Sequence, residues 1–156
     1  MHKLVAVLAL NVSLLIAEPF GVDSPLQTLN DYRYETPHGR QMKIPRSTQL
    51  VVIAFEKNTG ALVNDFLNTQ DPFYMSKHRA VFIADINKMP RVITNLFALP
   101  KMQKYKHLVY LHYDEKFQNF VPHKEEKITL ARIEDGKVQS ISYISTTEEL
   151  KAAIQK

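Results

Sequence analysis

Residues 50–67 read LVVIAFEKNTGALVNDFL and decide the fold of the chain. The first six form an unbroken apolar run rich in β-branched side chains, which predicts a strand buried on both faces of a parallel sheet. The remainder predicts an amphipathic helix, and we expect Asn58 or Thr59 to cap its start. Four side chains of this helix, spaced so that they share one apolar face, are Leu62, Val63, Phe66 and Leu67.

A second strand and helix follow downstream. Residues 80–84 (AVFIA) predict another buried strand, which ends at Asp85. Pro90 suits the first turn of a helix, and Pro100 is expected to bend or end it. The apolar face of this helix consists of Val92, Ile93, Leu96 and Phe97. A third short strand is expected at residues 108–111, so the central part of the chain alternates strands with helices.

A β-hairpin is predicted on each side of this central part. In the first hairpin, the side chains of residues 29–34 alternate between two faces as in a strand, and residues 36–39 (TPHG) form the turn. Residues 41–44 form the second, returning strand. At the second, strands at 127–133 and 138–144 flank the turn sequence EDGK.

The last helix is expected to begin at a Ser145 or Thr146 cap, and its inner face consists of Leu150, Ala153 and Ile154. The predicted order is therefore hairpin, strand, helix, strand, helix, strand, hairpin and helix. Such an order predicts an α/β domain with one mixed sheet and helices on both faces.

This pattern resembles the thioredoxin-like superfamily in its exported, hairpin-bearing form. Residues 29–44 resemble the N-terminal hairpin of exported thiol-disulfide oxidoreductases and peroxiredoxins. Residues 50–67 resemble the core strand and the helix that carries the redox motif, and residues 127–154 resemble the closing half. The resemblance implies a thioredoxin-like mixed sheet flanked by helices, with an N-terminal β-hairpin.

The departures from the family bear on function. The redox motif of the family is expected at residues 56–62, which read EKNTGAL, and the whole chain has no cysteine. Ile128 stands where the family has a cis-proline, and Thr129 matches the residue after it. Thiol-disulfide exchange and thiol peroxidase activity both need a thiolate, so they are excluded, and no catalytic residue is carried over.

The first seventeen residues contain a charged, an apolar and a cleavable region in the order that is typical of a secretory signal peptide. Lys3 gives a positive start, residues 4–16 are almost wholly apolar, and Ala17 precedes Glu18-Pro19. We expect cleavage after Ala17 and a periplasmic or secreted mature chain; the alternative is an uncleaved anchor, because Leu15 stands where a small residue is usual. The expected division is a signal peptide at 1–17, a leader at 18–28 and a domain at 29–156.

Composition narrows the classes of function. A net charge of +4 favours solubility over a nucleic-acid partner. The four glycines are isolated, so no Gly-rich phosphate loop predicts a nucleotide or flavin cofactor. The chain contains no Gly-x-Ser-x-Gly sequence, the motif that would indicate a serine hydrolase.

Histidines and one aspartate are the candidates for ligand chemistry. None of the five histidines after residue 17 is spaced as a helical metal pair, and His107 and His112 should point to opposite faces. Asp85 lies at the carboxyl end of a strand, where α/β folds bind ligands, although Asp85 or Asn87 capping the helix at Pro90 is the favoured interpretation. No cofactor or metal is therefore assigned.

One basic cluster surrounds Tyr105 and consists of Lys101, Lys104, Lys106 and His107. A solvated helix end that complements the helix dipole explains it better than an anionic partner does.

The leading hypothesis is a non-catalytic, exported thioredoxin-like protein that binds a protein or peptide partner through Lys57, Asn58, Thr59 and Ile128. One alternative is a small-molecule or metal-binding periplasmic protein that uses Asp85 and histidines. Another is a thiol-free enzyme with Asp85 or His112 as its acid–base group. The sequence assigns neither the partner nor the oligomeric state.

Overall fold

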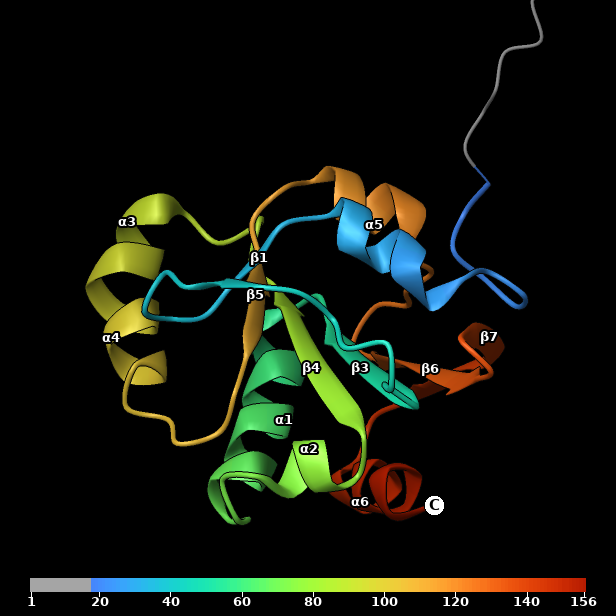
Figure 1. Cartoon of the computed structure of the whole chain (residues 1–156). Helices are drawn as coiled ribbons and strands as arrows, with labels where there is room; N and C mark the ends of the chain where they lie inside the picture. The colour runs from blue at the N-terminus through green and yellow to red at the C-terminus, as the bar shows by residue number, and fades with distance from the viewer. Residues whose placement is uncertain (1–17) are drawn as a thin grey trace, which may run out of the picture.

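A computed structural model of the chain describes residues 18–156 (Figure 1). The expected signal peptide at 1–17 lies outside these residues. The elements in chain order are the 3-10 helix η1 (Leu26–Asp31), β1 (Tyr34–Glu35), β2 (Gln41–Met42), β3 (Leu50–Ala54), α1 (Lys57–Asn68), α2 (Tyr74–Lys77), β4 (Ala80–Asp85), α3 (Arg91–Ile93), the π-helical turn η2 (Thr94–Ala98), α4 (Leu99–Met102), β5 (Tyr110–His112), α5 (Lys116–Phe120), β6 (Ile128–Glu134), β7 (Lys137–Ile144) and α6 (Thr147–Gln155).

The strands form one seven-stranded sheet in the order β2-β1-β5-β4-β3-β6-β7. The central pairs β3–β4 and β4–β5 are parallel, and the outer pairs are antiparallel. The prediction of an α/β fold with a mixed sheet is confirmed. All five residues of β3 and all six of β4 are buried, as their continuous apolar runs predict.

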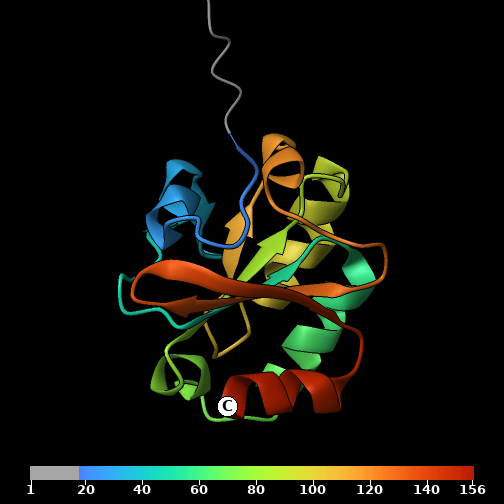
Figure 2. The same cartoon turned by 90° about the vertical axis from the view of Figure 1, so that its right-hand side faces the viewer.

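Helices cover both faces of this sheet, and each face has its own apolar core. Figure 2 shows η1 and α5 on one side of the sheet and α1 and α6 on the other. On the α1 side, Val63, Phe66 and Leu67 pack with residues of α6 such as Leu150. The predicted inner face of α1 is therefore confirmed.

The predicted start of the first hairpin is wrong. Residues 29–31 belong to η1 instead of a strand, because Leu26 and Leu29 lie one 3-10 turn apart and are both buried. The strands shorten to β1 and β2, but the turn between them is confirmed. Gly39 closes that turn with a φ of 82° and donates its N–H to the Thr36 carbonyl at 2.8 Å.

The predicted cap of α1 is also wrong. Neither Asn58 nor Thr59 caps this helix, because it already begins at Lys57 and Glu56 is its N-cap residue. Thr59 is the third residue of the helix, and its Oγ1 accepts the N–H of the N-cap residue Glu56 at 3.3 Å. At α6, by contrast, the expected Thr146 cap is confirmed, since Thr146 Oγ1 accepts the Glu149 N–H at 3.1 Å.

The helix expected after Pro90 is present, but Pro100 does not end it. The helical segment continues through α3, η2 and α4 to Met102. Pro100 has no N–H, and its ring obstructs the carbonyl of Leu96 one turn back. The chain passes this point by widening into η2, where the Leu99 N–H donates to the Thr94 carbonyl five residues earlier.

Candidate functional site

The resemblance places a redox motif where β3 ends and α1 begins, and here a carboxylate occupies that edge of the sheet. Glu56 Oε1 accepts the Glu126 N–H at 2.8 Å, which joins the start of α1 to the loop before β6. Glu126 has a φ of 58°, in the left-handed region. We call this contact the Glu56 latch. It holds together the two segments that the resemblance places on either side of a redox pair.

The four predicted contact residues do not share one exposed surface. Lys57 and Asn58 are exposed on the first turn of α1. Thr59 is only 5 % exposed, and Ile128 is fully buried opposite Ile144 in the β6–β7 pair. Of the four, only Lys57 and Asn58 therefore have side chains accessible from solvent. Their role as contacts stays a prediction.

Asp85 and His112 are neighbours on the parallel strands β4 and β5, and both are buried. Both carboxylate oxygens of Asp85 accept from Asn87 Nδ2, at 2.9 and 2.8 Å. The expectation that Asp85 or Asn87 caps the next helix is wrong, because its N-cap is Pro90, without a side-chain bond. Asp85 instead orders the turn at Asn87.

Both ring nitrogens of His112 face backbone carbonyl oxygens. Its Nδ1 lies 2.9 Å from the Arg33 carbonyl oxygen, and its Nε2 lies 3.0 Å from the Asp114 carbonyl oxygen. Binding a metal or serving as an acid–base group would require one of these contacts to break. Within residues 18–156, no three histidine, aspartate or glutamate side chains gather to hold a metal.

His107 lies on the opposite face of the sheet from His112, as predicted. It packs on the α1 side, where its Nε2 lies 2.9 Å from Asn64 Oδ1. Burial lowers the pKa of His107 to about 4, so the ring is neutral near pH 7 and donates Nε2–H to Asn64. In the predicted basic cluster, the three lysines are exposed, whereas His107 is 8 % exposed and stacks on Tyr105.

The helix that follows Pro90 exposes the apolar face that its spacing predicts. The exposed fractions of its four apolar side chains are 65 %, 44 %, 64 % and 65 % for Val92, Ile93, Leu96 and Phe97 respectively. We call these four residues the crest. The α3 and α4 ribbons lie at the opposite end of the molecule from β6 and β7 (Figure 1). Residues 86–113 around the crest include five Lys or Arg and no Asp or Glu.

A hollow of about 710 Å³ lies near the amino ends of β4 and β5, at the opposite end of the parallel strands from the Glu56 latch. It is bounded by the hairpin turn at 36–40, the loop at 45–48, α2 and the segment at 102–110. Arg40, Arg79 and Lys106 line it, and none of its lining residues is acidic. Sequence reasoning missed this hollow because its walls come from four separate segments.

Comparison with known proteins gives a result for structure but not for sequence. No protein-family model matches the chain. No curated protein matches it. A solved structure of the bacterioferritin comigratory protein from Xanthomonas campestris superposes with a TM-score of 0.54 at 15 % identity, covering 87 % of this chain and 94 % of the other.

The fold is thioredoxin-like. A putative protein disulfide isomerase from Bacteroides thetaiotaomicron superposes with a TM-score of 0.53 at 14 % identity, over 89 % of this chain and 87 % of the other. An SCO1/SenC family lipoprotein from Bacillus anthracis superposes with a TM-score of 0.53 at 12 % identity, over 90 % of this chain and 97 % of the other. This thioredoxin-like chain has no cysteine, so it cannot perform thiol chemistry.

Proposed function

We propose that this thioredoxin-like chain is a non-catalytic binding protein whose partner is a protein or peptide, and that it acts outside the cytoplasm. The crest is the single observation that carries the proposal. Its four apolar side chains lie side by side on one helix, and each is between 44 % and 65 % exposed. Contiguous exposed apolar surface is typical of interaction sites.

The charge around the crest indicates what kind of partner fits. Lys88 and Arg91 precede it and Lys101 and Lys104 follow it, all of them exposed. A second copy docked on the same face would bring these like charges together, which opposes association. The partner that complements this surface is a protein segment that carries both apolar and acidic side chains.

The Glu56 latch supports the non-catalytic part of the proposal. Its carboxylate joins two backbone segments at the edge where the resemblance expects cysteines, so the position has a structural role here. Lys57 and Asn58 remain exposed beside the latch. They are a second surface through which a partner would bind.

Action outside the cytoplasm is supported by two observations. The apolar run at residues 4–16 has the order of a secretory signal. One structural neighbour is a lipoprotein. No helix within residues 18–156 is long and apolar enough to span a bilayer.

Fractionation of expressing cells, with mass spectrometry of the mature N-terminus, tests the proposal that the chain is exported. A periplasmic chain that begins at Glu18 is the expected result.

A cross-linking pull-down of the mature chain tests partner binding. Wild type is compared with a crest variant, Leu96→Ser with Phe97→Ser, and with an α1 variant, Lys57→Ala with Asn58→Ala. A control variant, Val22→Ser, removes an exposed apolar side chain elsewhere, because Val22 is 61 % exposed.

We expect a partner that wild type and the control capture and the crest variant loses. Loss in the α1 variant alone would move the contact surface to Lys57 and Asn58. Capture by all four proteins would count against both surfaces. If no protein is captured and the wild type binds phosphatidylglycerol vesicles, the crest binds a membrane surface and not a protein partner.

A further inference from the structure

The hollow at the amino ends of β4 and β5 is distinct from the crest and from the Glu56 latch. Its volume of about 710 Å³ lies within the range of small-molecule sites, which is roughly 300–1,000 Å³. Hydrogen bonds join two of its walls: the His38 Nε2 lies 3.2 Å from the Gln103 carbonyl oxygen, and Gln103 Nε2 donates to the Pro37 carbonyl at 3.1 Å. These bonds link the hairpin turn to the segment after α4.

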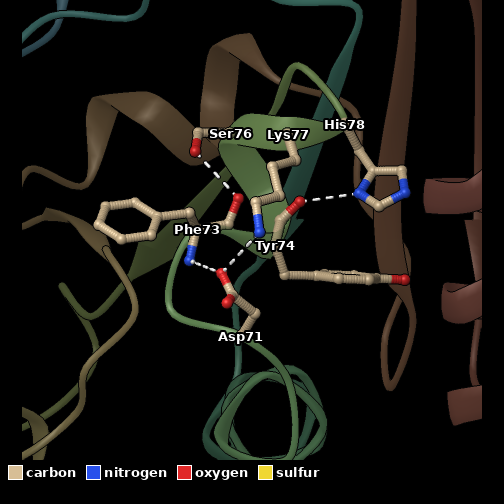
Figure 3. Close-up of polar contacts among 6 residues, drawn as sticks. All are labelled: Asp71, Phe73, Tyr74, Ser76, Lys77 and His78. Atoms are coloured by element: carbon tan, nitrogen blue, oxygen red, sulfur yellow. Dashed lines mark hydrogen bonds and ion pairs between the residues drawn. The ribbon is translucent and has the colours of Figure 1, made fainter.

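The wall formed by α2 is held by its own polar contacts. Asp71 Oδ1 accepts the Phe73 N–H at 2.8 Å and pairs with Lys77 Nζ at 3.2 Å. In Figure 3 the side chains of Phe73 and Ser76 point to one side of this segment, and those of Tyr74 and His78 point to the other. Phe73 and Ser76 both line the hollow. The segment therefore presents an aromatic ring and a hydroxyl to it.

Three cationic side chains line the hollow from backbone positions that hydrogen bonds restrain. Arg40 donates its N–H to Thr36 Oγ1 at 3.1 Å. The Arg79 carbonyl accepts the N–H of Gln49 at 2.7 Å, which anchors it at the start of β3. Lys106 precedes His107, which is tied to α1 through Asn64. These bonds fix the backbone from which each cationic side chain extends toward the hollow.

These cations have no carboxylate partner. In the part of the chain that the structure describes, Lys77–Asp71 is the one ion pair within 4.0 Å. Asp71 is thus engaged by Lys77, and no acidic residue lines the hollow. Arg40, Arg79 and Lys106 consequently create a positive potential that favours an anion.

The floor of the hollow is apolar. It consists of Met75, Ala80, Phe82, Met102 and Val109, which all belong to the apolar core on the α1 side of the sheet. Apolar surface of this kind favours the hydrocarbon part of a ligand over water. A site with cationic walls and an apolar floor matches a molecule with one anionic group and an apolar body.

We propose that this hollow binds a small amphiphilic carboxylate, with the carboxylate held by Arg40, Arg79 and Lys106 and the aliphatic or aromatic body on the apolar floor. This function is independent of the crest and of its protein partner. Guanidinium groups suit a carboxylate because they can donate two parallel hydrogen bonds to it.

Isothermal titration calorimetry of the mature chain with three probes tests the proposal. Decanoate carries both the charge and the body, decanol carries the body alone, and acetate carries the charge alone. The test variant is Arg40→Gln with Arg79→Gln. Its matched control is Lys137→Gln with Lys151→Gln, which removes two exposed positive charges from β7 and α6.

We expect saturable 1:1 binding of decanoate, and binding of decanol and acetate weaker by about ten-fold or more. The test variant should lose about ten-fold in decanoate affinity, and the control should match wild type. Backbone amide shifts should concentrate at residues 79–82 and 106–110. Equal binding of decanol and decanoate, equal loss in both variants, or shifts confined to the crest would each overturn the proposal.

A further variant separates loss of the site from loss of the fold. Phe73 is 67 % exposed, so Phe73→Ser leaves the fold intact but removes apolar wall. We expect it to weaken decanoate binding by a few-fold without affecting the unfolding midpoint. Unchanged decanoate affinity in this variant would contradict the placement of the body in the hollow.

Discussion

Helix α1 and the helical segment from Arg91 to Met102 carry the same apolar spacing, and the protein uses them in opposite ways. In α1, Val63, Phe66 and Leu67 are buried against the sheet and α6. In the later segment, the crest residues at the matching positions are exposed, and Thr94 and Met102 on another face are buried. Spacing specifies which side chains share a face of a helix, whereas the neighbouring elements decide which face is covered.

The largest expected effect comes from matched substitutions in the two helices. Phe66→Ala should cost about 3–5 kcal/mol of unfolding free energy, because it leaves a cavity in the core. Phe97→Ala should change that free energy by about 0.5 kcal/mol or less, because the ring is already in water. Urea denaturation of both variants measures the difference. A cost for Phe97→Ala close to that for Phe66→Ala would mean that the crest is covered in solution.

The strands and the second half of the fold could be predicted because their signals are local. β3 and β4 are continuous apolar runs, and the β6–β7 turn has Asp135 and Gly136 at positive φ, as a two-residue hairpin requires. Where two local signals competed, the prediction failed: residues 29–31 alternate like a strand, but Leu26 and Leu29 bury together as a 3-10 turn.

The candidate sites could be predicted only in part, because their contacts are long-range. Glu56 and Glu126 lie 70 positions apart, and nothing in either segment alone indicates the latch. The hollow likewise needs the hairpin turn, α2 and the segment after α4 together. The acid-free stretch at 86–113 was the one sequence signal that could have marked the crest as a surface.

The second expected effect is a pH dependence at the contact that links α1 to the segment after α4. The pKa of His107 falls from 6.5 to about 4 on folding, because burial disfavours its charged form. The unfolded chain therefore binds a proton at a higher pH than the folded chain does. The stability should decrease as the pH falls from about 6.5 to about 4, by on the order of 1–3 kcal/mol.

Urea denaturation of wild type and His107→Gln at pH 7 and pH 4.5 measures this dependence. The variant cannot titrate at this position, so its stability should fall less than that of wild type over the same interval. Equal losses in the two proteins would show that carboxylates elsewhere cause the acid sensitivity and that His107 does not.

A smaller effect is expected where the starts of the two helices differ. Glu56 is the N-cap of α1 and holds Glu126, whereas Pro90 begins the crest helix without a side-chain cap. Glu56→Ala should cost about 1 kcal/mol, and Glu56→Gln, which keeps an acceptor oxygen, should cost less. Thermal unfolding compares the two variants. An equal cost for both would mean that the charge of Glu56 matters and that the latch geometry does not.

The smallest expected change in stability tests why the crest helix contains a π turn. In Pro100→Ala, the new N–H can donate to the Leu96 carbonyl, which contributes about 0.5–1.5 kcal/mol. Loss of the proline ring frees the unfolded chain and costs about 0.4–1 kcal/mol, so the net change should be close to zero. Hydrogen exchange reveals what stability does not: the new amide at position 100 should be protected if the turn becomes α-helical. An unprotected amide there would show that packing of Thr94 and Met102, and not Pro100, maintains the π turn that orients the crest.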